Sequence, residues 1–341
     1  MVLCFLFIVY FLLSQRSFAV VDLHLARAPL ASEPIRKGFG EGLLAAGKAY
    51  PNVVGACADL TESTQMHLFA EAFPDRFIEV GVAEQNLATM AAGLAALGKI
   101  PFISSYAAFS PGRNWEQIRT TISLNDRPVK IVGSHAGLYT GADGATHQML
   151  EDIAMMRVLP NMVVIAPCDS HEAYRATLAM AADRRPNYMR VTREATPVIT
   201  TDKTPFEIGK AYVYQTGQDV SIVATGTMTA QALSAIKLLA EKDISAELVH
   251  VPTIKPLDEA TILASAKKTN KVVTVEEAQI NGGLGGAVAE LLGENLPTPM
   301  LRLGMRDCFG ESGKPEELLE RFGLTAKHIV AAVEKLMSGK R

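Results

Sequence analysis

Short apolar runs alternate with helical segments from residue 32 onward. Apolar runs bounded by turn residues predict strands at 52–58, 77–80, 100–105, 129–133 and 162–166. Ser32 can cap a helix that runs to about residue 50, and a second helix, rich in small apolar residues, is predicted at 84–96. Apolar strands that alternate with helices are typical of a parallel sheet covered on both faces.

A polar, turn-rich segment interrupts this alternation near residues 196–205. After it, the pattern predicts strands at 220–224, 245–250 and 271–276, and helices at 228–242, 258–269, after the glycines at 282–286, and at about 325–338. We therefore predict two doubly wound α/β domains, at 32–196 and 207–341, joined by a linker at 197–206. The second domain is the smaller.

The N-terminal segment, residues 1–31, differs from the rest of the chain. Residues 2–13 are continuously apolar, but a helix needs about 20 such residues to span a bilayer. The run has the length of a signal-peptide core, although no Lys or Arg precedes it. A spurious extension, a signal peptide or membrane anchor, and a packed element all remain open, so the fold prediction leaves this segment out.

Composition narrows the function classes. The chain has 341 residues, 48% hydrophobic and 20% charged, with a formal net charge of −3, which indicates a globular protein. A nucleic-acid binder needs a basic surface, so this class is disfavoured. The four cysteines are far apart and form no CxxC pair, which argues against a disulfide framework or a cysteine zinc site. Buried, reduced thiols are expected instead.

Glu84 is the first candidate for chemistry, because it follows a strand and begins a very apolar helix. A carboxylate buried there resists ionisation and can share a proton with a ligand nitrogen. The alternative is an ordinary first-turn Glu favoured by the helix dipole. Nearby, Phe109 and Trp115 could form a wall for a planar ligand, or could simply be core residues.

A glycine-rich loop between 134 and 148 carries His135, Asp143 and His147. Their spacing is not that of a metal site on a helix, so no metal site is predicted on this chain. Two histidines and an aspartate on one loop suit proton transfer and hydroxyl recognition better. Arg190 and Arg193 alternate with apolar residues at a strand end, where they form either a solvated face or a phosphate fork.

Together these segments resemble the transketolase family of thiamine diphosphate enzymes. The resemblance covers essentially all of 32–341, as that family's pyrimidine-binding domain followed by its C-terminal domain. The matching segments are Ile35-Arg36-Lys37, Ala58-Asp59-Leu60-Thr61, the segment around Glu84, Gly141-Ala-Asp-Gly-Ala-Thr-His-Gln148 and Leu159-Pro160-Asn161.

The resemblance implies a role for each matching residue. Glu84 would be catalytic through the pyrimidine N1′ of the cofactor, with Phe109 and Trp115 as its aromatic wall and Asp59 near its thiazolium side. His135 and His147 would be catalytic and, with Asp143, would contact donor-sugar hydroxyls. Arg36 and Arg193, assisted by Ser63, would bind the substrate phosphate.

The resemblance also implies a partner subunit. The family's other domain holds the diphosphate through Mg²⁺ with a Gly-Asp-Gly motif. This motif does not occur in the present sequence. The chain therefore resembles the C-terminal half of a split transketolase, and its cofactors would be thiamine diphosphate and Mg²⁺, the latter bound by an N-terminal subunit. An assembly of two copies of each chain, sugar phosphates as substrates, a role in the pentose phosphate pathway and a cytoplasmic location are what the resemblance implies.

Three rival interpretations remain. A 1-deoxyxylulose-5-phosphate synthase has a similar histidine loop, but usually carries Arg at the position of His135 and is usually a single chain. The β subunit of a 2-oxo acid dehydrogenase is also split, but fits the Thr146-His147-Gln148 loop poorly. A non-catalytic scaffold would be expected to have lost Glu84, His147 or Arg193.

The Asn281–Gly286 turn has the glycines of a phosphate cradle but not the dinucleotide spacing, which favours a structural role.

Overall fold

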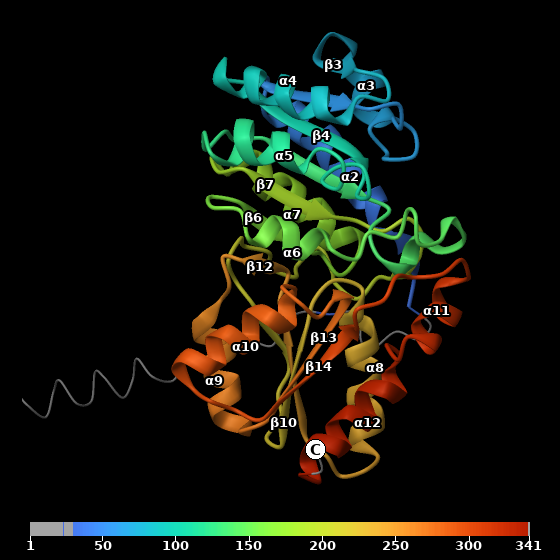
Figure 1. Ribbon diagram of the computed structural model, residues 1–341, viewed down its shortest axis with the longest axis vertical. Helices are drawn as coiled ribbons and strands as arrows, with labels where there is room; N and C mark the ends of the chain where they lie inside the picture. Colours follow the sequence, from blue (N-terminus) through green and yellow to red (C-terminus); the bar gives the residue numbers. More distant parts are fainter. Residues whose placement is uncertain (1–22, 24–29, 340–341) are drawn as a thin grey trace, which may run out of the picture.

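The computed structural model describes residue 23 and residues 30–339. Two α/β units lie one above the other along the long axis, each built around its own sheet (Figure 1). The predicted fold class is confirmed. The apolar run at 2–13 lies outside the described residues, and no helix within them is long and apolar enough to cross a membrane.

The first unit is built on a seven-stranded sheet in the order β12-β6-β7-β5-β4-β2-β3. Its strands are β2 (Val53–Cys57), β3 (Phe77–Glu79), β4 (Ile100–Tyr106), β5 (Lys130–Ser134), β6 (Val163–Ile165), β7 (Asn187–Arg190) and β12 (Thr253–Lys255). All neighbours pair in parallel except β12, which runs antiparallel to β6. The strands predicted for this unit are confirmed, with ends that differ by a few residues.

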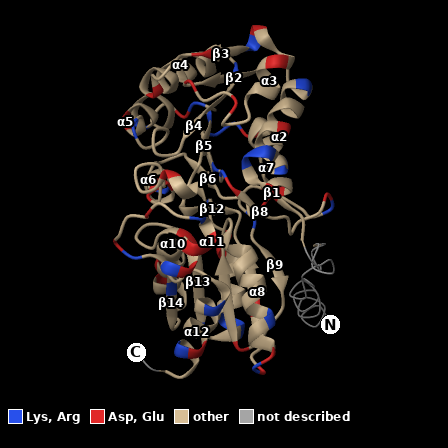
Figure 2. Cartoon of the chain, turned by 90° about the vertical axis from the view of Figure 1, so that its right-hand side faces the viewer, with Lys and Arg blue, Asp and Glu red and all other residues tan. Residues whose placement is uncertain are grey.

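Helices cover both faces of this sheet, as the apolar strands require. On one face lie α2 (Ile35–Ala49) and α7 (Ser170–Ala182), with α3 (His67–Ala72) and the short 3₁₀ helix η2 (Pro74–Arg76) beside them. On the other face lie α4 (Glu84–Ala96), α5 (Trp115–Gln117), the π-helical η3 (Ile118–Ser123) and α6 (Asp152–Arg157) (Figure 2). A separate cluster of buried apolar side chains fills the space on each face.

The second unit has a five-stranded sheet in the order β14-β13-β10-β11-β9. Its strands are β9 (Tyr212–Gln215), β10 (Val220–Ala224), β11 (Ala246–His250), β13 (Val272–Gln279) and β14 (Met300–Met305), and its helices are α8 (Met228–Ala240), α9 (Glu259–Thr269), α10 (Leu284–Asn295), α11 (Pro315–Arg321) and α12 (Ala326–Met337). Only β9 among these strands is antiparallel to its neighbour. Two buried clusters again fill the two faces.

The two units are joined by more than the connecting segment. β12 belongs by sequence to the second unit, yet it forms the edge strand of the first unit's sheet. A fully buried pair adds to this junction, because Glu172 of α7 lies 2.9 Å from Nε2 of His250 in β11. The neighbouring Cys168 amide donates to the same carboxylate, so this Glu is fully hydrogen-bonded.

Some predicted details were wrong. Ser32 does not cap α2; residues Ser32–Pro34 form a short strand, β1, which pairs with β8 (Ala195–Pro197). The helix then begins at Ile35, after Pro34, whose ring suits a helix start. Strands β9, β12 and β14 and helix α11 were not predicted. Cys57 and Cys168 are buried free thiols as expected, whereas Cys308 is exposed.

α2 and α7 pack very closely because glycines face the neighbouring helix. A Cβ atom added at Gly38 would overlap the backbone of Ser170, and one at Gly42 would lie 2.8 Å from Cβ of Thr177. Backbone atoms of a buried helix cannot move aside at little cost, since the interior is close-packed. The glycines of α2 therefore set the distance between these helices.

We expect Gly38→Ala to lower the free energy of unfolding by about 3 kcal/mol, because overpacking of this kind forces backbone shifts. Gly93 is the matched control, since an added Cβ there meets no atom within 4 Å. Gly93→Ala should raise stability by about 0.8 kcal/mol through helix propensity. Urea denaturation followed by circular dichroism measures both, and equal stabilities for the two variants would contradict this account of the packing.

Candidate functional site

The predicted site residues meet at one edge of the first sheet. β2, β4, β5 and β7 are parallel, so their carboxyl ends lie side by side. Asp59 follows β2, Phe109 follows β4, His135 follows β5 and Arg193 follows β7. Ligands of open α/β sheets bind at this edge, outside the carboxyl ends of the strands.

Glu84 is the first residue of α4, and its side chain is only 2% exposed. Its Oε2 accepts a hydrogen bond from Nη1 of Arg113 at 2.8 Å, and its backbone carbonyl accepts one from Asn114. The guanidinium carbon of Arg113 lies 4.7 Å from the ring centroid of Phe109. A planar nitrogen-bearing group thus already lies between a carboxylate and an aromatic face.

The carboxylate of Glu84 and the face of Phe109 fit an aminopyrimidine. A buried carboxylate can accept a hydrogen bond from a protonated ring nitrogen, and an aromatic face can stack on the ring. The guanidinium of Arg113 uses both contacts in the same way. Ser105, buried at the carboxyl end of β4, has a hydroxyl without a partner among the described residues. Glu84 and Phe109 are therefore suited to hold such a ring.

Four rings form a cluster near Glu84, in which Tyr106 stacks on two rings and His147 packs edge-on. Tyr106 lies on His135 with centroids 3.7 Å apart, and its other contacts are with Phe109 at 6.1 Å and His147 at 6.1 Å. The edge of His147 also faces Phe109 at 5.4 Å. Stacked and edge-on contacts of this kind fix ring orientation, so the two histidines have defined positions.

His135 is buried in a left-handed backbone conformation, with φ of 56°. Ser134 Oγ shares a hydrogen bond of 2.9 Å with its Nδ1. Burial, reinforced by the positive charges of Arg36 and Arg193 and by His147, lowers the pKa of His135 to about 3. The imidazole is therefore neutral near pH 7, which suits a hydrogen-bond partner rather than a cationic acid. His147 is half-buried, and Thr146 Oγ1 shares a hydrogen bond with its Nδ1.

Arg36 and Arg193 lie close enough for their charges to interact. Burial, followed by the charge of Arg193, lowers the pKa of Arg36, and no carboxylate in the described part of the chain lies within ion-pair distance of Arg36. Its Nη1 donates to the backbone carbonyl of Ser63 at 2.6 Å. Arg193 contacts Asp143 at 3.1 Å and Glu194 at 3.5 Å. Two adjacent guanidinium groups, one without an acidic partner, form a site for an anion.

The remaining predicted residues lie at different distances from this centre. The amide of Asp59, whose φ is 60°, donates to Glu79 at 2.7 Å, so the turn after β2 is held by that carboxylate. Trp115 packs against the core, and its indole donates to the carbonyl of Met155 at 2.9 Å. Tyr106, rather than Trp115, is the second aromatic ring that contacts Phe109.

Sequence reasoning missed three contributors. Tyr106 contacts the rings of Phe109, His135 and His147. Arg113 pairs with Glu84, and Glu79 holds the turns at Asp59 and Gly81. The signal for Tyr106 was its place directly at a strand end. Arg113 could have been found as a cation one helical turn after Phe109, beside a carboxylate expected to be buried.

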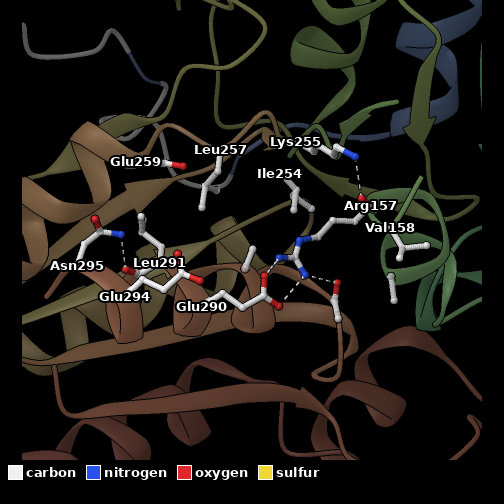
Figure 3. Close-up of a pocket in the computed structure, with 13 residues that line it drawn as sticks. Arg157, Val158, Ile254, Lys255, Leu257, Glu259, Glu290, Leu291, Glu294 and Asn295 are labelled. Atoms are coloured by element: carbon white, nitrogen blue, oxygen red, sulfur yellow. Dashed lines mark hydrogen bonds and ion pairs between the residues drawn. The ribbon is translucent and has the colours of Figure 1, made fainter. Parts of the chain in front are cut away.

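Two other features of the chain lie away from this site. In the turn at 282–286, the amides of Leu284 and Gly285 donate to Glu276, whose pKa burial raises to about 7, so these two amides are already used within the chain. A cleft of about 840 Å³ opens between β12, α9 and α10, where Arg157 pairs with Glu290 (Figure 3). None of the predicted site residues lines this cleft.

Comparisons with known proteins agree with the sequence resemblance. Residues 33–198 match the family "Transketolase, pyrimidine binding domain", and residues 209–329 match "Transketolase, C-terminal domain". A putative transketolase C-terminal section from Methanocaldococcus jannaschii is 48% identical over 89% of this chain and 96% of its own length. A 6-deoxy-6-sulfo-D-fructose transketolase subunit from Clostridium sp. is 42% identical over 90% and 95%.

A solved structure is similar as well. It is described as a split gene transketolase, an inactive β4 tetramer, and matches with a TM-score of 0.85 and 44% identity. The match covers 90% of this chain and 99% of that one. Both the fold and the length of the present chain thus correspond to those of a split-transketolase β chain.

We expect His135 to stay neutral from pH 8 down to about pH 4, as followed by NMR of its ring C–H signals. An unfolded His has a pKa of about 6.5, so between that pH and about 3 the unfolded chain binds more protons. The stability linked to His135 is therefore lost as the pH falls through this range.

Arg193→Gln should raise the pKa of His135, because one of the charges that oppose the imidazolium is removed, although burial still holds the pKa low. Arg184→Gln is the control, since this exposed arginine follows α7 at the opposite edge of the sheet. Titration of His135 near pH 6.5 in the unmodified chain would contradict the assignment.

Proposed function

The chain belongs to the transketolase family, and on this premise we propose that it is the C-terminal subunit of a split transketolase. Together with an N-terminal subunit, it would transfer a two-carbon ketol unit from a ketose phosphate, such as xylulose 5-phosphate, to an aldose phosphate. The observation that carries the proposal is the buried Glu84 carboxylate, which Arg113 joins to the face of Phe109, at the same end of the sheet as the histidine loop and the two arginines.

Thiamine diphosphate, when bound, supplies an electron sink for cleavage of the bond next to a ketose carbonyl. Glu84 would share a proton with the pyrimidine N1′, and Phe109 would stack on the pyrimidine ring. Arg113 must move from Glu84 for the ring to enter, because it occupies the same carboxylate oxygen and the same aromatic face. Asp59, at the turn after β2, would lie toward the thiazolium side.

We propose that the partner subunit holds the diphosphate end and Mg²⁺. The groups on this chain that fit the cofactor are a carboxylate and an aromatic ring, which suit the pyrimidine end. The carboxyl edge of the first sheet would face the partner, so that each complete site contains residues of two chains. Active assemblies would then require both subunits.

The histidine loop and the arginines would bind the donor. Arg36 and Arg193 would bind its terminal anion, because Arg36 has no ion-pair partner among the described residues and the Asp143 partner of Arg193 is partly exposed and can be replaced. Neutral His135 would accept or donate a hydrogen bond at the donor hydroxyls, and His147 and Asp143 would complete that contact. Ser63 would assist by holding Arg36 through its carbonyl.

The most specific part of the proposal is the chemical nature of the donor's terminal anion, a phosphate or a sulfonate. A relative described above is named for a sulfonated sugar, and a guanidinium pair can bind a sulfonate as well as a phosphate. A phosphate dianion gains more from two guanidinium groups than a sulfonate monoanion does. We therefore favour phosphorylated sugars.

The first test is an assay of this chain alone and with a co-expressed candidate N-terminal subunit, in thiamine diphosphate, Mg²⁺, xylulose 5-phosphate and ribose 5-phosphate. We expect turnover only when both chains are present. In the assembly, Glu84→Gln should lower kcat by about 10²–10⁴-fold, the range that a proton-transfer group contributes. Near-normal rates in that variant, or product from pyruvate and glyceraldehyde 3-phosphate instead, would contradict the proposed function.

Arg193→Ala should raise KM for xylulose 5-phosphate by about tenfold or more, since charge-assisted bonds to an anion are worth about 1.5–3 kcal/mol. The KM for hydroxypyruvate, which carries no phosphate, should change far less. Arg184→Ala serves as the matched control on the opposite edge of the sheet. Equal increases for both donors would remove Arg193 from the phosphate site.

A further inference from the structure

The second unit holds the histidine loop of the first unit through a buried acidic residue that the proposed mechanism does not use. We propose that Glu277 of β13 is a positioning residue, which fixes the segment 135–148 and thereby sets the positions of His135 and His147. This inference rests on the proposed function for its catalytic meaning. The contacts that carry it are structural and do not depend on that function.

Glu277 reaches the loop directly. Its Oε1 accepts a hydrogen bond of 2.9 Å from the amide of Tyr139, the second residue of the short 3₁₀ helix η4 (Leu138–Asp143). Its Oε2 accepts one of 2.5 Å from Thr227 Oγ1. The carboxylate lies so close to Gly137, whose φ is 75°, that an added Cβ there would overlap Oε1. The loop thus lies directly against this side chain.

A buried arginine of the first unit holds the backbone at Glu277. Arg190 at the end of β7 is buried, donates from Nη1 to the backbone carbonyl of Glu277 at 3.1 Å, and forms an ion pair with Asp152 at 3.3 Å. Burial raises the pKa of the Glu277 carboxyl, and the positive charge of Arg190 opposes part of that rise. Residues of both units therefore hold the loop that contains the segment 141–148.

A second tie lies at the other end of the loop. Gln148 donates from Nε2 to the carbonyls of Gly141 and Glu311, at 3.0 and 2.8 Å. An added Cβ at Gly310 would overlap Oε1 of Gln148, which shows how closely the 310–313 segment covers the loop. Next to it, the amide of Gln279 donates to the carbonyl of Leu150 at 2.8 Å. The loop is held at both ends by the second unit.

The catalytic meaning follows from where the two histidines lie. His135 lies just before Gly137 and Tyr139, the two loop residues against which Glu277 lies. Thr140, next to Tyr139, donates to the carbonyl of His135 at 2.6 Å. Small misplacements of reacting groups can lower a rate by about 100-fold. Glu277 touches neither substrate nor cofactor in the proposed function, so its effect on catalysis would act through the loop.

The test is hydrogen–deuterium exchange of the isolated full-length chain, which needs neither a partner nor a substrate. Glu277→Leu should speed exchange across 136–149 by about tenfold, the factor for about 1.4 kcal/mol of lost hydrogen bonding. Glu277→Gln should restore slow exchange, because an amide oxygen still accepts from Tyr139. Glu276→Leu is the matched control: Glu276 is the adjacent buried carboxylate, yet it holds the start of α10.

The outcomes separate cleanly. Faster exchange of the loop in Glu277→Leu alone, reversed in Glu277→Gln, supports the proposal. Unchanged loop exchange in a folded Glu277→Leu chain, or equal loosening in Glu276→Leu, overturns it. If Glu277→Leu does not fold, Thr227→Val takes its place, because it removes the hydrogen bond that holds Oε2 of Glu277; unchanged exchange of 136–149 in that variant overturns the proposal equally.

In the assembled enzyme the same variants give a second readout. Glu277→Leu should lower kcat by about tenfold or more, and Glu277→Gln should recover most of that loss. If the assembly shows no transketolase activity at all, the proposed function fails, whereas the exchange result still decides whether Glu277 positions the loop.

Discussion

Parallel pairing of β2, β4, β5 and β7 is the constraint on which the rest of the structure depends. It brings the carboxyl ends of four strands to one edge, so that segments up to 134 residues apart, from Asp59 to Arg193, become neighbours. The strands are buried on both faces, which requires apolar side chains within the sheet. The predicted site residues therefore lie in the segments that follow the strands.

Burial and charge then divide the site into two parts. Near Glu84 a single buried carboxylate is joined through Arg113 to the face of Phe109, and these surroundings favour a planar ring. Near Arg36 two positive charges lie together, and their effect reaches His135, whose pKa they help to lower. One part suits a heterocycle and the other an anion, while the histidine loop lies between them. This division is what the proposed reaction between a cofactor and a charged sugar would require.

Much of this could be predicted from the sequence, because the signals are local. Glu84, Phe109 and His135 each follow an apolar run, and parallel strands place such residues together. What could not be predicted depends on contacts between distant residues. Glu277 meets Tyr139 across 138 positions, and Arg113 reaches Glu84 by a side-chain conformation that no pattern encodes. β12 was missed because only one of its three residues, Ile254, is apolar, so no apolar run marks this strand.

The strand β12 also bears on how this protein can be divided. The sequence suggests a cut near residue 200, yet residues 253–255 cover the edge of β6 in the first sheet. A fragment that ends at the linker would leave one edge of β6 unpaired, although β6 would still pair with β7. Open strand edges promote association between copies. The second half of the chain therefore donates a strand to the first, and a first half moved into another protein would have to carry that strand with it.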